Sequence, residues 1–486
     1  MKLVELMEKN DQKKIQLLYF LDQHPNQKVK NNVIQDKLRI SYYLFKNLTK
    51  EIAEDIDAFQ LADFFNIEIT ETHTILYEHH NTNASVFLAH YLKRSYQVKI
   101  LIAVMIEFKS FNLNDFAEAH YVSYAFMYKR FAMLRKTLMG WEIVLNKNAE
   151  LTGDELAIRL LLSEIVIITH LGGAHFNEDV RTAVDQLLNL ADTPEIVLSM
   201  SQLIETKSYF LVSLLRFQQG YSIKTSQEIA DLIRNIGQKT VGARVNAIRV
   251  FEAHFRDNER EINSECDYLV TFLAIMGIIT SEDIVFPETI KSKGRAFIQG
   301  FEENFHLTLE ESEKDNIEYE VNKCFVDILT LPFRSQFFDE HIEVSFFFRT
   351  YPEFFEYCQK FVLYETTLKS DSNKAKFMFY HCLLTLAANV PLNKILAPLN
   401  VCVDFTLGKE YNKIIERDIK YFSTLNVEVT NTVLPETKLI ITDLVNAYSE
   451  CDISKVIWLS PPRPEDWENL IDELLDLRLE GAVQND

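Results

Sequence analysis

The stretch Asn112–Lys147 limits most narrowly what this chain can fold into. Its pattern predicts a short helix, a tight corner at Tyr121–Val122 and a longer helix that begins at Ser123. A strand-like run, Trp141–Leu145, follows and closes as a small β-wing. Helix, turn, basic helix and wing together predict a winged helix-turn-helix. The face of the longer helix that is predicted to meet a core carries Phe126, Leu134 and Leu138.

The charge of the longer helix indicates what such a module would bind. Tyr121–Lys147 holds five lysines and arginines against one acid, although the whole chain carries a formal net charge of −21. That excess of acid would repel DNA phosphates if it were spread evenly. Residues 1–165, however, hold 20 basic and 21 acidic residues, so almost all of the excess lies further along the chain. A basic helix of this kind is expected to enter the major groove of DNA.

The same pattern occurs earlier in the chain. Ile40-Ser41-Tyr42 and Val122-Ser123-Tyr124 superpose at an offset of 82 residues, and basic residues surround both corners. Serine is a favourable N-cap for the helix that follows. We therefore predict an internal duplication that yields two tandem winged helices. In the first of them the expected elements are helices at Asp11–Gln23, Lys28–Arg39 and Tyr42–Ile56 and a hairpin at Asn66–His79.

The rest of the chain is predicted to be mostly helical and to end in a small sheet. Thr152–Glu155 fits a capping box for a helix that runs to Ile168. Helical patterns then follow one another up to residue 394, among them Pro194–Glu205 and Tyr209–Gln218, which favours two consecutive bundles. After Leu399, strands alternate with helices, as in an α/β domain with a mostly parallel sheet. The expected domains are 1–82, 83–168, 169–281, 282–394 and 395–486.

The predicted fold class is therefore mainly α and multidomain, and several classes of function are not expected. The longest apolar run, Tyr268–Thr280, is about 13 residues, short of the roughly 20 that cross a bilayer. The N-terminus lacks the apolar core of a signal peptide. Six scattered cysteines without a CxxC pair are typical of reduced thiols in a cytoplasm. Signatures of nucleotide-binding, hydrolytic and metalloprotease sites are absent, so no enzyme, metal or cofactor is expected.

Two local runs and the order of the predicted domains resemble a known family. Gly140-Trp141-Glu142-Ile143, followed by the run from Leu151 to Arg159, is similar to the junction after the second winged helix in Mga/AtxA-type virulence and global transcriptional regulators of Gram-positive bacteria. The resemblance implies that the bundles are PTS-regulation (PRD) domains controlled by phosphotransferase-system proteins. It also implies that the last domain is EIIB-like and joins two chains in a homodimer.

The same resemblance implies that histidines of the bundles are phosphorylated. In the first bundle Ile204 stands where a related regulator has its phosphorylated histidine, whereas His381 lies near the equivalent site of the second. An active EIIB domain needs a cysteine in the loop after its first strand, and this chain has Thr406–Lys409 there, so phosphotransfer by that domain is not expected. A lone helical histidine is more often a packed or surface residue than a switch. The candidate phosphosites are His254, His306, His341 and His381.

Double-stranded DNA is the expected partner, and a membrane is not. Acids crowd the end of the basic helix in the first unit, so the second unit is expected to dominate binding. The alternatives are a solvated basic face with packed tyrosines, or a signal-sensing scaffold whose winged helices bind protein. The candidate DNA contacts are Ser123, Tyr124, Tyr128, Lys129, Arg130, Arg135, Lys136 and Lys147 in the second unit, and Ser41, Tyr42, Tyr43, Lys46, Asn47 and Lys50 in the first.

Overall fold

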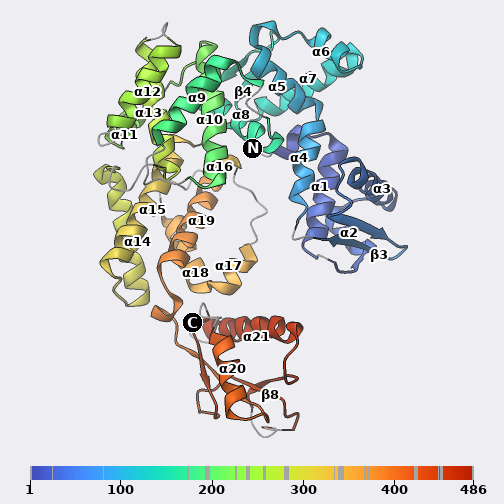
Figure 1. Cartoon of the computed structure of the whole chain (residues 1–486), viewed down its shortest axis with the longest axis vertical. Coiled ribbons are helices and arrows are strands. Elements are labelled where there is room, and N and C mark those ends of the chain that lie inside the picture. Colours follow the sequence, from blue (N-terminus) through green and yellow to red (C-terminus); the bar gives the residue numbers. More distant parts are fainter. Residues whose placement is uncertain are drawn as a thin grey trace. The chain divides into compact units, whose positions relative to one another are not determined.

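Helices dominate the chain, which divides into two compact units, Met1–Val285 and Phe286–Asp486 (Figure 1). The predicted mainly helical fold with a small C-terminal parallel sheet is confirmed, whereas the division into five domains stays a prediction. No helix in the described part combines the length and the apolar character needed to cross a membrane. The computed structural model describes residues 3–24, 26–79, 82–171, 175–191, 198–224, 227–236, 241–255, 259–278, 284–332, 334–337, 344–365, 368, 371–420, 425–446, 448 and 452–483.

The first winged helix combines three helices with a three-stranded antiparallel sheet of order β1-β3-β2. Val29 lies opposite Thr74 in that sheet, so the prediction of one helix over Lys28–Arg39 is wrong at its start. The helix begins after the strand, at Asn31, whose side-chain amide donates to the carbonyl of Thr70 at 3.0 Å. The elements are η1 (Leu3–Leu6), α1 (Lys9–Asp22), β1 (Val29–Lys30), α2 (Asn31–Leu38), α3 (Tyr42–Ala58), β2 (Phe65–Ile69) and β3 (His73–Glu78).

The second winged helix follows a linking helix, α4 (Ser85–Arg94). Its wing is the antiparallel pair β4–β5, in which Leu145 lies opposite Leu151. The first strand begins at Ile143 rather than at Trp141, because Glu142 takes a positive φ of 61° and turns the chain before the strand. The elements are α5 (Tyr96–Glu107), η2 (Phe108–Ser110), α6 (Leu113–Ala119), α7 (Tyr124–Met139), β4 (Ile143–Leu145) and β5 (Leu151–Gly153).

The two winged helices repeat each other around their corners. Arg39 and Tyr121, 82 residues apart, both adopt the left-handed conformation, with φ of 52° and 55°. Two residues later Ser41 and Ser123 cap α3 and α7, and each hydroxyl accepts from the backbone N–H three residues on, at 3.3 and 3.2 Å. Four buried positions also coincide at that offset: Phe45, Thr49, Ile52 and Ile56 in α3, and Met127, Phe131, Leu134 and Leu138 in α7.

A helical bundle completes the first unit. Its first helix is capped by Asp154, which accepts from the N–H of Ala157 at 2.9 Å; the capping box predicted on Thr152 is wrong, because Thr152 belongs to β5. The two helices expected at Pro194–Glu205 and Tyr209–Gln218 are wrong as separate elements, because one helix runs through the polar joint between them and buries Thr206 and Ser208. Residues 192–197, where the first of the two was expected to begin, lie outside the described part. The helices are α8 (Glu155–Thr169), α9 (Glu178–Ala191), α10 (Met200–Gln218), α11 (Gln227–Ile236), α12 (Val241–His254) and α13 (Glu259–Ile275).

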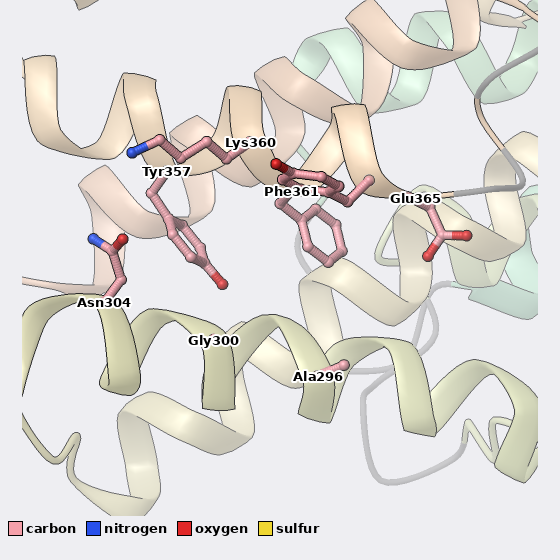
Figure 2. A pocket seen from close by; sticks show the side chains of 8 residues that line it. Ala296, Gly300, Asn304, Tyr357, Lys360, Phe361 and Glu365 are labelled. Atoms are coloured by element: carbon pink, nitrogen blue, oxygen red, sulfur yellow. The ribbon is translucent and has the colours of Figure 1, made fainter.

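The second unit opens with another helical bundle. An open cavity of about 310 Å³ lies in this bundle, and Gly300, Tyr357 and Phe361 are among the residues that line it. In Figure 2 the ring of Tyr357 points toward Gly300. A Cβ on Gly300 would lie 2.9 Å from the Tyr357 hydroxyl, so the glycine is what admits this ring. The Tyr357 hydroxyl donates to the carbonyl of Phe297. The helices are α14 (Glu288–Phe305), α15 (Glu311–Thr330), α16 (Arg334–Phe337), α17 (Val344–Thr350), α18 (Pro352–Tyr364), α19 (Ser372–Asn389) and η6 (Leu392–Lys394).

A four-stranded parallel sheet of order β7-β6-β8-β9 ends the chain. Its two central strands are fully buried at Val401, Val403, Leu439 and Ile441, and α20 and α21 contribute to the same core. Cys402 lies inside β6, as expected. The elements are β6 (Leu399–Asp404), α20 (Lys409–Lys420), β7 (Val427–Thr430), β8 (Leu439–Thr442), β9 (Ser454–Ile457) and α21 (Pro464–Val483).

Candidate nucleic-acid interface

The solvent-facing side of α7 carries most of the candidate contacts of the second unit. Because its apolar residues recur at helical spacing and point into the core, the side chains between them face outward. Tyr124 and Tyr128 are half-exposed, with rings 6.0 Å apart. No acid in the described part pairs with the three exposed candidate lysines, Lys129, Lys136 and Lys147. The exposed candidates are Ser123, Tyr124, Tyr128, Lys129, Lys136 and, in the turn of the wing, Lys147.

Arg130 differs from its neighbours because it is held inside the molecule. Its guanidinium forms an ion pair with the carboxylate of Glu8, just before α1, and lies 4.9 Å from the ring centroid of the half-buried Phe126. Burial raises the pKa of the Glu8 carboxyl, although the charge of Arg130 acts in the opposite sense. Less than a quarter of the Arg130 side chain is exposed. It therefore joins α7 to the N-terminal segment, and the predicted phosphate contact would require breaking that pair.

Arg135 is also engaged within the protein. Its Nε donates a 2.8 Å hydrogen bond to the carbonyl of Leu145, the last residue of β4. The side chain is half-buried between α7 and the wing. It therefore fixes the angle between the candidate contact helix and the wing, a role that sequence spacing alone did not suggest.

The first unit presents a similar but less basic surface. Tyr42 and Tyr43 are 58% and 75% exposed at the start of α3, and Lys46 follows one turn later. Lys50 is exposed but lies 3.5 Å from Glu54, an acid on the same helix. The remaining candidates are Ser41, which is exposed and caps the helix, and Asn47, which is half-buried.

A buried charge cluster joins the first winged helix to α4. The Arg94 guanidinium donates to Asp11 at 2.8 Å and to Asp55 at 2.5 Å, and the buried Lys14 ammonium lies 2.7 Å from Asp55. Burial alone would raise the pKa of Asp55, but the hydrogen bonds from Arg94 and Lys14 prevail and lower it. Asp11 belongs to α1 and Asp55 to α3, so the cluster fixes the orientation of α4 on these two helices. A buried cluster of this kind is stable only while every partner is present.

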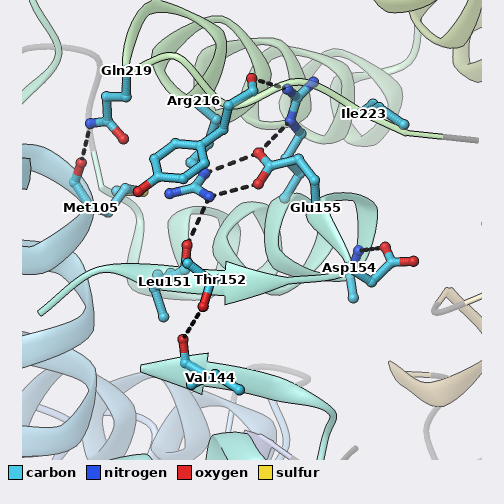
Figure 3. A network of polar contacts seen from close by, with 12 residues as sticks. Met105, Val144, Leu151, Thr152, Asp154, Glu155, Arg216, Gln219 and Ile223 are labelled. Carbon is cyan, nitrogen blue, oxygen red and sulfur yellow. Dashed lines mark hydrogen bonds and ion pairs between the residues drawn. The ribbon is translucent and has the colours of Figure 1, made fainter. Parts of the chain in front are cut away.

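A second polar network connects the wing to the first bundle (Figure 3). The Arg216 guanidinium of α10 donates to the Glu155 carboxylate at 3.0 and 2.6 Å and to the carbonyl of Leu151 at 3.2 Å. Arg159, which is fully buried, donates to the same Glu155 at 2.9 Å and to Glu265 of α13 at 2.5 Å. Two arginines thus share one carboxylate at the start of α8, directly after the wing.

These contacts form a continuous path from the bundle to α7. Arg216 holds the carbonyl of Leu151, Leu151 pairs with Leu145 across the wing, and the carbonyl of Leu145 accepts from Arg135. We call this path, made of Arg216, Leu151, Leu145 and Arg135, the wing strut. A movement of α10 relative to α8 would therefore change the position of the wing against α7. Within the adjoining network, the sequence suggests only the ion pair between Glu155 and Arg159, which lie four residues apart on a helix. The contacts of Arg216 with Glu155 and Leu151 leave no such local pattern.

The candidate phosphosites are dispersed. His381 is half-buried, with its ring 4.3 Å from that of Phe377, and burial lowers its pKa to about 4. His254 is half-buried, and its Nε2 lies 3.2 Å from the side-chain oxygen of Gln186. His306 is exposed at the left-handed end of α14. His341 lies outside the described residues.

A helix-turn-helix with a wing and an outward-facing row of lysines defines a DNA-binding type of regulator domain. Comparison with family models assigns residues 80–165 to the Mga helix-turn-helix domain. The chain therefore carries the domain of the Mga-like family of transcriptional regulators, as the sequence resemblance predicted. The matched segment contains the complete second winged helix and the N-terminal part of α8 with Glu155 and Arg159. A search of curated proteins found no match to the chain.

Proposed function

We propose that this protein is a cytoplasmic transcriptional regulator that binds double-stranded DNA mainly through α7 and its wing. The observation that carries the proposal is the exposed row on α7: Tyr124, Tyr128, Lys129 and Lys136 face solvent on a helix with an Mga-type match. Lysines supply the phosphate contacts that dominate affinity. Arg130 and Arg135 support the row from within, so they are omitted from the proposed contacts. The first unit adds Tyr42, Tyr43 and Lys46 as a weaker second contact.

A salt titration of DNA binding tests this proposal with the full-length protein. Each lost phosphate contact makes the negative slope of log K against log salt shallower by about 0.9. Lys129→Ala/Lys136→Ala should therefore reduce its magnitude by about 1.8. Lys413→Ala/Lys420→Ala, which removes two exposed lysines from α20, is the matched control and should leave the slope unchanged. Equal affinities for wild type and the α7 double variant would overturn the assignment. A salt-independent complex with protein rather than DNA would support the scaffold alternative.

We propose further that the first bundle controls DNA binding through the wing strut. The support is the direct hydrogen bond between α10 and β5, which makes the bundle a neighbour of the wing rather than a distant domain. The input is phosphorylation by phosphotransferase-system proteins on a bundle histidine, as the resemblance implies; a phosphate adds about −1.5 to −2 charges. Incubation with the general phosphotransferase proteins and phosphoenolpyruvate tests this step, and absence of acid-labile phosphate on the chain would end it.

The C-terminal EIIB-like domain is proposed to join two chains. Its support is a set of exposed apolar residues in the loops that follow the strands and on edge strand β9: Leu407, Leu444, Val445, Ile457 and Leu459. These residues follow or belong to the neighbouring parallel strands β6, β8 and β9, whose carboxyl ends lie at one edge of the sheet, and apolar surface exposed together in this way marks interaction sites. Sedimentation of full-length Val445→Glu should show the monomer at concentrations where wild type is a dimer, with Asn431→Glu as an exposed control. A wild-type protein that stays monomeric at micromolar concentration would exclude this role.

A further inference from the structure

Exposed tyrosines gather at the corners of the two winged helices. Among the described residues, six tyrosines are more than a third exposed, and five of them lie at or just before the N-terminal turns of α3 and α7. The exposed fractions are 58% for Tyr42, 75% for Tyr43, 98% for Tyr121, 51% for Tyr124 and 53% for Tyr128. The sixth tyrosine is Tyr364, which lies outside both winged helices, in the unit Phe286–Asp486. A ring left in water on a folded surface forgoes the free energy that burial would provide, so each of these two groups of tyrosines marks a contact surface.

The duplication singles out one tyrosine ring in each winged helix. Tyr42 and Tyr124 are both the first residue of their helix, both directly follow the capping serine, and both are about half-exposed. In helix-turn-helix proteins the N-terminal residues of the second helix contact base edges, so these two rings take the positions that face the bases. The lysines stand further along, at Lys46 and Lys129. Bidentate recognition of guanine by a cation is therefore not available at the first position.

The chemistry of the ring narrows the base it can read. In the major groove thymine alone presents a methyl group, and apolar side chains recognise it by packing against that group. A tyrosine ring supplies a flat apolar surface at little cost in conformational entropy. We infer that Tyr124, and Tyr42 in the first unit, read thymine by packing against its 5-methyl group. This inference deepens the proposed function and rests on it.

Replacing thymine by deoxyuridine tests the inference, because it removes only the methyl groups. The full-length protein first selects a binding fragment from a random duplex pool, and that fragment is then made with thymine or with uracil. Wild type should bind the uracil fragment about two- to fourfold more weakly for each methyl group contacted. Tyr42→Ala/Tyr124→Ala should weaken binding to the thymine fragment and should no longer distinguish the two fragments, whereas Tyr124→Ala alone should reduce the discrimination. Tyr124→Phe keeps the ring without the hydroxyl and should retain the wild-type discrimination.

Two further variants separate the effect of the ring from that of phosphate contacts and from that of an exposed tyrosine elsewhere on the protein. Lys129→Ala should weaken binding to both fragments by the same factor, since phosphates are identical in them. Tyr364→Ala, which removes an exposed ring from the unit Phe286–Asp486, should change neither affinity. Equal wild-type affinity for both fragments would overturn the inference, and so would a Tyr42→Ala/Tyr124→Ala protein that still prefers thymine. A protein that selects no duplex at all would overturn the proposed function instead.

Discussion

The carbonyl oxygen of Leu151, in the wing, accepts a 3.2 Å hydrogen bond from the guanidinium of Arg216, which belongs to the helical bundle. The two residues lie 65 positions apart in sequence. The same guanidinium holds the Glu155 carboxylate, so one side chain fixes both the end of the wing and the start of the next helix. The control proposed above would therefore need no long pathway, because the bundle already contacts the wing.

Arg216→Met should therefore weaken both the fold and the coupling. Removing one member of a buried ion pair costs about 3–5 kcal/mol, and because Arg159 still neutralises Glu155 we expect about 2 kcal/mol here. Urea unfolding of the full-length protein measures this loss. Arg234→Met removes an exposed arginine whose one ion-pair partner among the described residues is Asp231, and it should cost less than about 1 kcal/mol. Equal unfolding midpoints for Arg216→Met and wild type would show that the contacts of Arg216 in the wing strut do not contribute to the free energy of unfolding.

Arg94→Met should destabilise the first winged helix and alter its acid sensitivity. Hydrogen bonds from Arg94 and Lys14 lower the pKa of Asp55 below that of the unfolded chain, so the ionised carboxylate stabilises the fold above about pH 4. That contribution is lost as the pH falls through the folded pKa. The variant should be about 2 kcal/mol less stable at pH 7 and should lose less stability between pH 5 and pH 3. Unfolding curves at these pH values, with the exposed neighbour Lys93→Met as control, measure both effects.

Glu8→Gln should raise affinity for DNA. The Glu8 carboxylate holds Arg130, and its replacement frees this partly buried guanidinium to turn outward from α7. One added phosphate contact would strengthen binding by about threefold at moderate salt and steepen the salt dependence by about 0.9. Glu5→Gln removes the same charge three residues earlier without releasing a guanidinium, so it separates the local effect from the change in net charge. Identical salt slopes for the two variants would show that Arg130 stays in place.

His381→Gln should make the second bundle less sensitive to acid. Burial lowers the pKa of His381 to about 4, below the ordinary value near 6.5, so the folded state binds fewer protons than the unfolded state between these values. Stability is therefore lost as the pH falls from 6.5 to 4. At pH 5 the wild-type protein should lose about 2 kcal/mol through this residue, and the variant should not. Thermal unfolding at pH 7 and pH 5 measures it, with the exposed His306→Gln as control.

The sequence predicted the parts of the fold that depend on local pattern. The serine caps, the corners and the apolar faces of α3 and α7 all follow from spacing within one or two turns. The errors arose where a partner far along the chain decides the local structure. Val29 was assigned to a helix, but β3 pairs with it, and Thr152 was assigned to a cap, but β4 pairs with it.

The candidate contacts show the same division. Counting charges identified α7 as basic but could not tell which cations point outward, because Arg130 depends on Glu8, 122 residues earlier in the chain, and Arg135 depends on the wing. The lysines and tyrosines predicted from residue type remain exposed, since no distant group claims them in the described part. Long-range ion pairs leave no periodic signal in one sequence, and for that reason the two arginines were placed with the lysines.

The corner before each capping serine holds an ordinary side chain in the left-handed conformation, Arg39 in one unit and Tyr121 in the other. A bulky residue there costs roughly 1 kcal/mol that asparagine would largely avoid. Tyr121→Asn should therefore raise the melting temperature while removing the most exposed ring of the molecule from the surface proposed to meet DNA. Thermal stability and DNA affinity would then change in opposite directions at a single position. A variant with a higher melting temperature and a lower affinity for DNA would show that this corner trades stability for binding.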